Sequence, residues 1–470
     1  MATHTDSLYA DWKKQYPRYQ SGFFRNVRWA SVIVLLGIYY ILPFIRWDRP
    51  GSLPDQAVLF DLPERKFYIF DIVIWPQEIF LLALLLIAAA LGLFFITALA
   101  GRVFCGYMCF QTVWTDLFLQ VERFFEGNRK RRIKLDQAPW NLEKLARKLG
   151  KHLVWLLIGL VTAGVFVFYF SDAPTLLRGF LSGNAPSSAW ITLAFLTLTT
   201  YTMAGFAREQ VCIYMCPYAR FQGAMFDDDT IIVAYHPELG EPRQANRRIR
   251  NTTPEKVGLC IDCRECVTVC PTGIDIRNGQ QYECITCGAC IDACNTIKDK
   301  LHLPNELIRY TSLREMGGQK TRWFRFRILA YGILLTGFLG AIAACLVLRP
   351  PVELNVVHHR QPTYITQSDG SIQNNFTIRA LNMSSSQQTY SLGVSGLEGA
   401  SLKVAAIADV DPQGRPLLTL APGEVAPYTV YLKQAANHVQ HGPQEIIFQL
   451  TAIDPQGGEN SYQSVFMRPQ

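Results

Sequence analysis

The sequence CIDCRECVTVCPTGIDIRNGQQYECITCGACIDAC, from Cys260 to Cys294, contains two copies of the spacing Cys-x2-Cys-x2-Cys-x3-Cys. This spacing is typical of bacterial ferredoxins with two [4Fe–4S] clusters, in which the fourth cysteine of each run binds the other cluster. A zinc ribbon also uses Cys-x2-Cys pairs, but it does not require the triplet and the distant fourth cysteine twice. We therefore predict one cluster on Cys260, Cys263, Cys266 and Cys294, and a second on Cys284, Cys287, Cys290 and Cys270.

Long apolar runs predict membrane spans on both sides of this stretch. Hydrophobic residues make up 49% of the 470 residues, a length that suggests about three domains. Each run is close to the roughly 20 residues that a helix needs to cross a bilayer. One such run could be a buried core helix, but five flanked by Arg, Lys or Trp favour membrane spans. The runs are Trp29–Ile45, Ile79–Ala100, Leu153–Phe170, Ser188–Ala207 and Ile328–Leu348. The first follows a polar and charged segment, so we expect an anchor and not a cleaved signal peptide.

The charges of the connecting segments predict the orientation. Basic residues are concentrated before the first and fifth runs and after the second, whereas residues 48–78 are acid-rich and residues 171–187 are nearly uncharged. The positive-inside rule then places the N-terminus in the cytoplasm and the C-terminus in the periplasm of a bacterial inner membrane. The basic string NRKRRIK, from Asn128 to Lys134, is typical of a topology signal or a lipid contact, and we expect no nucleic-acid partner.

Four further cysteines form a weak internal repeat at the inner ends of two spans. The strings are CGYMCF, with Cys105 and Cys109, and CIYMCP, with Cys212 and Cys216. Residues four apart share one face of a helix, so four thiols could converge from two helix ends. Buried cysteines are often only packing residues. Two equivalent pairs beside an iron–sulfur domain favour a redox or metal role, and thiolates select Cu(I), zinc or iron–sulfur clusters.

The C-terminal segment differs in pattern. Apolar and polar residues alternate around Phe376, Val430 and Phe448, and the turn string Asp-Pro-Gln-Gly occurs twice. This predicts an immunoglobulin-like β-sandwich.

The predicted fold is a multi-domain membrane protein with a bundle of five transmembrane helices, a cytoplasmic bicluster ferredoxin-like domain and a periplasmic sandwich. Its segments are 1–28, cytoplasmic; 29–227, four spans with both Cys-x3-Cys motifs; 228–325, ferredoxin-type; 326–348, fifth span; and 349–470, periplasmic.

The chain resembles the cytochrome c oxidase accessory protein family called CcoG, FixG or RdxA. The resemblance is carried by AVLFDLPERKFYIF at Ala57–Phe70, AGRVFCGYMCFQTVWTD at Ala100–Asp116, the second cysteine run and the C-terminal segment. It implies a cupric reductase that serves maturation of a cbb3-type oxidase, with copper chaperones or importers and oxidase assembly factors as partners. The family motif has proline after the second membrane cysteine. Cys216 keeps it, but Phe110 follows Cys109, which puts the helix geometry there in question.

The sequence leaves the site chemistry partly open. We expect the clusters to carry single electrons, and Cys105, Cys109, Cys212 and Cys216 to be catalytic and to hold copper as substrate or transient ligand. The electron donor is unknown, because no nucleotide fingerprint is present. Two other functions remain possible: a quinol-linked polyferredoxin subunit, and a non-enzymatic scaffold for oxidase assembly.

Overall fold

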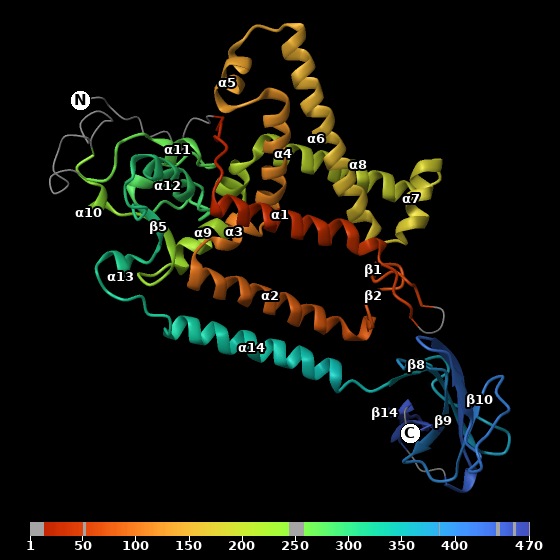
Figure 1. Ribbon diagram of the computed structural model, residues 1–470. Coiled ribbons are helices and arrows are strands. Elements are labelled where there is room, and N and C mark those ends of the chain that lie inside the picture. The colour runs from red at the N-terminus through yellow and green to blue at the C-terminus, as the bar shows by residue number, and fades with distance from the viewer. Residues whose placement is uncertain are drawn as a thin grey trace. The chain divides into compact units, whose positions relative to one another are not determined.

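The computed structural model describes residues 14–49, 53–243, 258–384, 386–438, 442–454 and 457–469. They divide into two units, one of Met1–Ile45 with Val58–Ile342 and one of Arg46–Ala57 with Ala343–Gln470. The first unit is mainly helical (Figure 1). Its helices are α1 (Phe23–Ile41), α2 (Ile79–Ala100), α3 (Val103–Tyr107), α4 (Phe110–Glu126), α5 (Arg129–Gln137), α6 (Leu142–Phe168), α7 (Ala173–Ser182), α8 (Ser187–Thr202), α9 (Pro217–Met225), α10 (Pro237–Gly240), α11 (Glu265–Thr268), α12 (Ala289–Leu301), α13 (Leu313–Met316) and α14 (Phe326–Val347).

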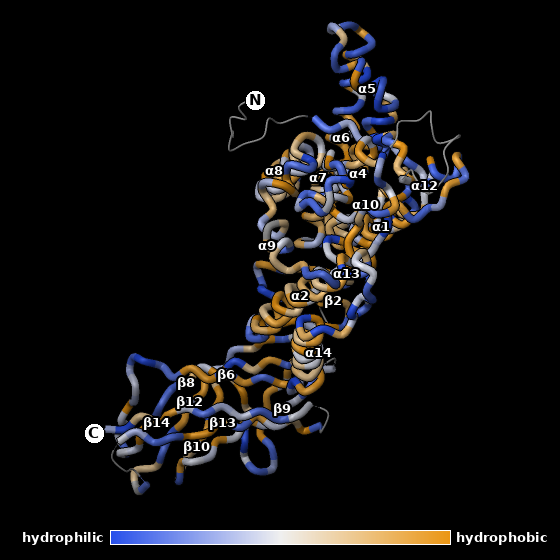
Figure 2. Tube along the Cα trace, turned by 90° about the vertical axis from the view of Figure 1, so that its left-hand side faces the viewer, coloured by the Kyte–Doolittle hydropathy of each residue, from blue (hydrophilic) through white to orange (hydrophobic). Residues whose placement is uncertain are grey.

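Among the residues that the structure describes, five helices are long and apolar enough to cross a membrane, as predicted. They cover Phe23–Phe44, Pro76–Ala100, Leu142–Phe168, Ser187–Ala207 and Phe326–Val347. α2 and α14 lie side by side and are hydrophobic along most of their length (Figures 1 and 2). Only 11% and 6% of their most apolar windows are buried. Because water would not tolerate so much exposed apolar surface, these helices require lipid around them.

The helix that contains the third apolar run begins earlier than its hydropathy predicts, at Leu142 and not at Leu153. Asn141 caps it, since the side chain accepts a hydrogen bond from the backbone N–H of Lys144. The added turns are polar but helical, because Lys148 and Lys151 pair with the buried Glu126 at 2.8 Å each. Hydropathy locates the lipid-facing part of a helix, whereas capping and ion pairs decide where the helix starts.

A small domain around the cysteine runs packs on two short strands, β4 (Ile232–Tyr235) and β5 (Ile308–Thr311). Its core includes Val233, Ile276 and Ile291 together with the cysteines. Residues 14–22 connect this domain to the helices. Arg18 pairs with Glu265 at 2.7 Å, and Arg132 donates to the carbonyl of Pro17 at 2.6 Å. A separate antiparallel sheet is formed by β1 (Val58–Asp61), β2 (Lys66–Ile69) and β3 (Ile72–Ile74).

The second unit contains two antiparallel sheets, as expected for an immunoglobulin-like sandwich. One has the order β10-β12-β8-β6 with β7 at its edge, and the other the order β11-β9-β13-β14. The alternating residues Phe376, Val430 and Phe448 are fully buried between them. The strands are β6 (Val352–His358), β7 (Ile365–Thr366), β8 (Ile372–Asn382), β9 (Gln388–Ser395), β10 (Ala400–Val404), β11 (Leu417–Leu420), β12 (Val425–Gln434), β13 (Gln444–Ala452) and β14 (Glu459–Phe466).

Buried charges hold α4, α5 and the turn after α8 together. The Glu122 side chain is fully buried and binds Arg208 at 2.9 Å and Arg132 at 3.3 Å. Burial by itself raises the pKa of Glu122, but the positive charges of Arg208, Arg132, Lys151 and Lys14 together outweigh burial, so the pKa is lowered overall. Glu122 is therefore ionised and fixes both arginines in place.

Replacing Glu122 by Gln should destabilise the protein by about 3–5 kcal/mol, because it leaves two buried arginines without their shared carboxylate. The measurement is thermal unfolding in detergent at neutral pH. Glu143→Gln is the matched control, since Glu143 pairs with Arg147 on an exposed face of α6. Its effect should be below about 0.5 kcal/mol. Equal effects of the two substitutions would contradict the role assigned to Glu122.

The pH dependence of the stability difference between native protein and Glu122→Gln tests the direction of the Glu122 pKa shift. A carboxyl group with a lowered folded-state pKa adds stability above its ordinary pKa and loses it as the pH falls through the folded value. The difference between native protein and Glu122→Gln should therefore shrink as the pH falls below 4.5, the ordinary value for this group.

Candidate functional site

The eight clustered cysteines line two neighbouring cavities, of about 390 and 360 Å³. Both are otherwise lined mainly by apolar side chains, such as Leu307 in the first and Val233 in the second. The first cavity is lined by Cys260, Cys263, Cys266 and Cys294, and the second by Cys270, Cys284, Cys287 and Cys290. Cys266 also reaches the edge of the second. The structure thus brings together the two sets that the crossed ferredoxin pattern predicts, and the clusters themselves stay a prediction.

Equivalent backbone turns flank the second cysteine of both runs, Cys263 and Cys287. Asp262 and Thr286, each just before the second cysteine of its run, have positive φ angles of 51° and 55°. Arg264 and Gly288, each just after that cysteine, have φ angles of 56° and 71°. Left-handed residues reverse the chain sharply, and only glycine adopts them without steric cost. The two runs therefore share one loop conformation, even though three of these four residues are not glycine.

The chemistry of these thiols fits an iron–sulfur cluster better than a single ion. Burial raises the pKa of Cys266 and of Cys284 to about 12, and that of Cys294 to about 11. Loading of metal must therefore displace protons from the thiols. In the part of the chain that the structure describes, no three or more Cys, His, Asp or Glu side chains lie close enough to hold one metal ion. Four thiols around an apolar cavity suit a cubane cluster, in which each iron takes one thiolate.

The two membrane-edge cysteine pairs lie at equivalent breaks in the helices, and not on one helix face as predicted. α2 ends at Gly101, with φ and ψ of 58° and −125°, and the five-residue helix α3 follows. In the second half, the π-helical turn η3 (Met203–Ala207) ends at Arg208, whose φ and ψ are 45° and −117°. The five-residue turn η4 (Val211–Met215) follows. The repeat seen in the sequence is thus a repeat of backbone geometry.

Each break stops the helix at its second cysteine. Both residues have an extended backbone: φ and ψ are −62° and 128° at Cys109, and −80° and 112° at Cys216. Each backbone N–H donates a hydrogen bond to the carbonyl oxygen five residues earlier in the chain, that of Phe104 at 2.9 Å for Cys109 and that of Val211 at 2.8 Å for Cys216. The extended residue then begins the next helix, α4 or α9. The expectation of thiols stacked four apart on one helix is therefore wrong. Phe110 in place of proline does not alter the break, because this wide turn forms in both halves.

The four thiols interact electrostatically with one another. Burial is the largest cause of the raised pKa of Cys105, about 11, and of Cys212, about 12. Repulsion from the other thiols in the group raises both pKa values further. The amide nitrogen of Gln222 lies 3.5 Å from the sulfur of Cys105. The structure thus places thiols from both halves of the repeat in one neighbourhood.

The loop of the second cavity packs directly on α3. A Cβ atom at Gly106 would lie 2.7 Å from the carbonyl oxygen of Ile285 and 3.1 Å from the Cα of Cys287. The hydroxyl of Tyr107 donates to the carbonyl of Cys287 at 3.1 Å. Arg102 adds hydrogen bonds to the carbonyls of Tyr282 and Ala219. Gly106 therefore allows the cavity loop to touch the helix that carries Cys105.

Sequence reasoning missed the contact made by Gly106, Tyr107 and Arg102. One signal was available: the two Cys-x3-Cys strings differ at the residue after the first cysteine, where Gly106 corresponds to Ile213. The first half needs a glycine at this position because α3 packs there against the backbone of the cysteine loop.

Comparison with known proteins agrees with this architecture. The 4Fe-4S dicluster domain model matches residues 207–313, the 4Fe-4S binding domain model residues 82–133, and the model for the IG-like fold at the C-terminus of FixG residues 342–469. The nitrogen fixation protein FixG of Rhizobium meliloti is 42% identical over 98% of this chain and 94% of its own length. Protein RdxB of Cereibacter sphaeroides is 49% identical over 83% of this chain and 84% of its own length.

The chain belongs to the FixG/RdxA family. It is an iron–sulfur, oxidoreductase-like electron-transfer protein of that family, with several candidate membrane spans. A crystal structure of a FixG-related protein from Vibrio parahaemolyticus aligns with 26% of this chain and 100% of that chain, at 20% identity and a TM-score of 0.22. The family resemblance expected from the motifs is confirmed.

The crossed arrangement of the cysteines makes a specific prediction. Cys270→Ser should remove the cluster that Cys284, Cys287 and Cys290 hold and should leave the cluster of the first cavity in place, because Cys270 lines only the second cavity. Of the about eight iron atoms that two cubanes contain, about four should be lost. The measurement is iron content with low-temperature EPR after anaerobic purification. Cys345→Ser, in α14, is the matched control and should keep all the iron. Loss of the first cluster alone would contradict the assignment.

Proposed function

We propose that this FixG/RdxA family member reduces Cu(II) to Cu(I) for the maturation of a cbb3-type cytochrome c oxidase. The observation that carries the proposal is the contact between the second cysteine-lined cavity and the membrane-edge thiols through Gly106. Cys260, Cys263, Cys266 and Cys294 would hold one [4Fe–4S] cluster, and Cys270, Cys284, Cys287 and Cys290 another. Bound there, the clusters would supply one-electron transfer between a donor protein and the thiols.

The residues at the acceptor end suit copper as substrate. Reduction of Cu(II) needs one electron and no proton, and the product Cu(I) is soft and prefers thiolate ligands. Since the described residues contain no tight group of three or more ligands, copper would be held by two of the thiols of Cys105, Cys109, Cys212 and Cys216. A loosely held ion is what a reductase requires, because its product has to leave. Copper chaperones or importers and oxidase assembly factors are the proposed partners.

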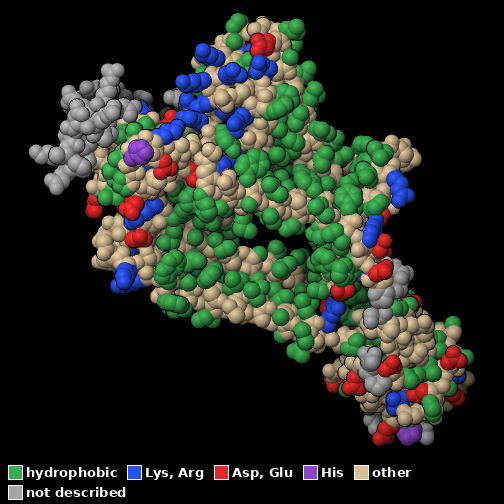
Figure 3. Space-filling view, in the orientation of Figure 1, with side chains coloured by type: hydrophobic (Ala, Val, Ile, Leu, Met, Phe, Trp, Pro, Cys, Tyr) green, Lys and Arg blue, Asp and Glu red, His purple; other side chains and the backbone are tan. Residues whose placement is uncertain are grey.

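The proposed orientation follows from charge. Lys and Arg side chains gather over the α4–α5 end of the helical unit, whereas hydrophobic side chains cover α1 and α2 (Figure 3). By the positive-inside rule this end faces the cytoplasm of a bacterial inner membrane. The N-terminus and the cysteine runs would then be cytoplasmic, and the immunoglobulin-like unit periplasmic. Copper would be reduced at the cytoplasmic edge.

A second candidate is quinol-linked electron transfer, favoured by one cavity. A space of about 450 Å³ lies between the segment after Cys270 and Cys212, and it is lined by Leu119, Ile285 and Glu209. Burial raises the pKa of Glu209, so a carboxyl group that can exchange a proton lies beside the thiols. Oxidation of a quinol releases two protons with two electrons. This candidate would be supported if Glu209→Gln lost quinol oxidation while its Cu(II) reduction stayed unaffected.

Copper chemistry at the thiols predicts that Cys109→Ala and Cys216→Ala slow Cu(II) reduction at least about tenfold, the factor that corresponds to 1.4 kcal/mol of lost binding. The measurement is anaerobic formation of Cu(I), trapped by a Cu(I)-specific chelator, in protein reduced beforehand. The EPR signals of both clusters should remain, and Cys345→Ala is the matched control. Unchanged reduction in the quadruple alanine variant would contradict the proposal. Loss of iron from the single variants would instead show that the thiols hold a further cluster, as the 4Fe-4S binding model over residues 82–133 allows.

The contact at Gly106 gives a test of the electron route. Gly106→Ala should slow Cu(II) reduction several-fold at full iron content, because the new Cβ would push α3 away from the carbonyl of Ile285. Gly223→Ala, in α9, is the control, since a Cβ there would meet no atom within 4 Å apart from its chain neighbours and the nearby backbone of its own helix. Equal rates in the two variants would show that electrons do not pass at this contact.

A further inference from the structure

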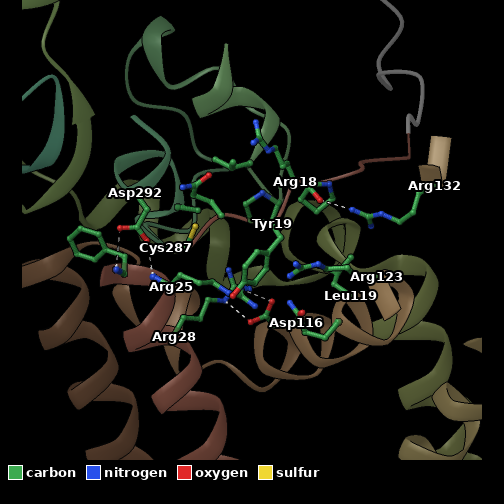
Figure 4. A pocket seen from close by; sticks show the side chains of 17 residues that line it. Arg18, Tyr19, Arg25, Arg28, Asp116, Leu119, Arg123, Arg132, Cys287 and Asp292 are labelled. Atoms are coloured by element: carbon green, nitrogen blue, oxygen red, sulfur yellow. Dashed lines mark hydrogen bonds and ion pairs between the residues drawn. The ribbon is translucent and has the colours of Figure 1, made fainter. Parts of the chain in front are cut away.

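A strongly basic pocket lies where α1, α4, residues 17–20 and the loop of Cys287 meet (Figure 4). The pocket has a volume of about 670 Å³ and is open to solvent. Five arginines and two aspartates are among the residues that line it. We call it the arginine pocket; the charged residues that line it are Arg18, Arg25, Arg28, Arg123, Arg132, Asp116 and Asp292. None of these residues belongs to the cysteine sites described above.

Two of the arginines share one carboxylate. Arg25 binds Asp116 at 2.9 Å and the Nε of Arg28 lies 3.4 Å from its other oxygen. Arg28 is only 7% exposed and its Nε faces Asp116, whereas the Nε and Nη2 of Arg25 are buried without a hydrogen-bond partner among the described residues. Buried donors without acceptors are costly. The protein thus keeps unused hydrogen-bonding capacity for a negative ligand here.

Arg18 and Arg132 are paired with Glu265 and Glu122, so the positive charge of the pocket comes from Arg123 and from the two arginines that share Asp116. Arg123 stacks on the ring of Tyr19, 3.8 Å from its centroid, and no acidic side chain in the described part of the chain pairs with it. Arg25 lies 5.2 Å from the centroid of the same ring. Asp292 is already engaged, since its two oxygens accept from the backbone N–H groups of Phe24 at 3.3 Å and Arg25 at 2.8 Å. Asp292 therefore caps the start of α1 and is not available to neutralise Arg123.

We propose that the arginine pocket binds a phosphate group, and that this group is the phosphodiester of an anionic membrane phospholipid. Guanidinium groups match phosphate oxygens in geometry and charge. The pocket opens at the first turns of α1, which begins a candidate membrane span. Large apolar side chains stand exposed on the same two helices, Phe23 at 70% on α1 and Phe124 at 82% on α4. Basic pockets between helices on the cytoplasmic side are where such headgroups bind.

A bound headgroup would join three parts of the chain. Arg18 and Tyr19 come from the segment that binds the cysteine domain, Arg25 and Arg28 from the first span, and Arg123 from α4. Cys287, a proposed ligand of the second cluster, lines the same pocket. The lipid would therefore hold the cysteine domain against the membrane surface, whichever substrate the protein reduces.

The test is native mass spectrometry of the detergent-purified holoprotein, delipidated and titrated with phosphatidylglycerol, phosphatidylcholine or inorganic phosphate. One phosphatidylglycerol per chain should bind in preference to phosphatidylcholine, and millimolar inorganic phosphate should not displace it. Arg123→Gln should weaken this binding about tenfold, as expected for the loss of a hydrogen bond to a charged group. Arg131→Gln is the matched control, because Arg131 is exposed on α5 outside the pocket, and should bind as the native protein does.

A second variant protects the test against loss of folding. Asp116→Asn removes one of the two negative charges of the pocket and should tighten phosphatidylglycerol binding, with iron content as the check on folding. Equal binding by Arg123→Gln and Arg131→Gln would overturn the proposal. So would a change in the same direction in Arg123→Gln and Asp116→Asn. Binding of inorganic phosphate that depends on Arg123, without binding of phospholipid, would overturn the assignment to a lipid.

Discussion

The contact of Gly106 with the carbonyl of Ile285 is the constraint on which the proposed electron route depends. Any side chain larger than hydrogen would meet that carbonyl at 2.7 Å, so only glycine lets α3 touch the cysteine loop. Tyr107 and Arg102 fix the same contact through hydrogen bonds to the loop. A break at Gly101 turns α3 toward the loop, and a second break at Cys109 ends it. Helix breaks and glycine together bring a membrane-edge thiol pair to the edge of a cysteine-lined cavity.

Charge burial supports this arrangement from the other side. Arg208 has an unfavourable positive φ for a non-glycine residue, and it stays there because its side chain binds the carbonyl of Gly205 at 2.7 Å and Glu122 at 2.9 Å. Gly101 fills the equivalent position of the first half without such help. The two halves of the repeat thus reach one backbone geometry by different means: a residue free to adopt it, and a residue held there by a buried ion pair.

Patterns of short range could be predicted from the sequence, and contacts between distant segments could not. The spacing of the cysteine runs determines which thiols meet, because each run is one local loop and the fourth ligand follows from the crossed pattern. The apolar runs give five spans, but not the start of α6 at Leu142, which depends on Asn141 and on Glu126. The i, i+4 interpretation of Cys105 and Cys109 failed because a wide turn interrupts the helix. The arginine pocket needs residues from α1, α4 and the cysteine loop, which no local pattern connects.

The central claim is that electrons leave the second cysteine-lined cavity through the Gly106 contact and reduce Cu(II) at the thiols. The most direct measurement is rapid-freeze EPR of anaerobic, fully reduced protein, freed of excess reductant and mixed with one equivalent of Cu(II). The account predicts that the Cu(II) signal and the signal of one reduced cluster disappear together, one for one, and that the signal from the second cavity decays first. A Cu(II) signal that persists while both clusters stay reduced would contradict it.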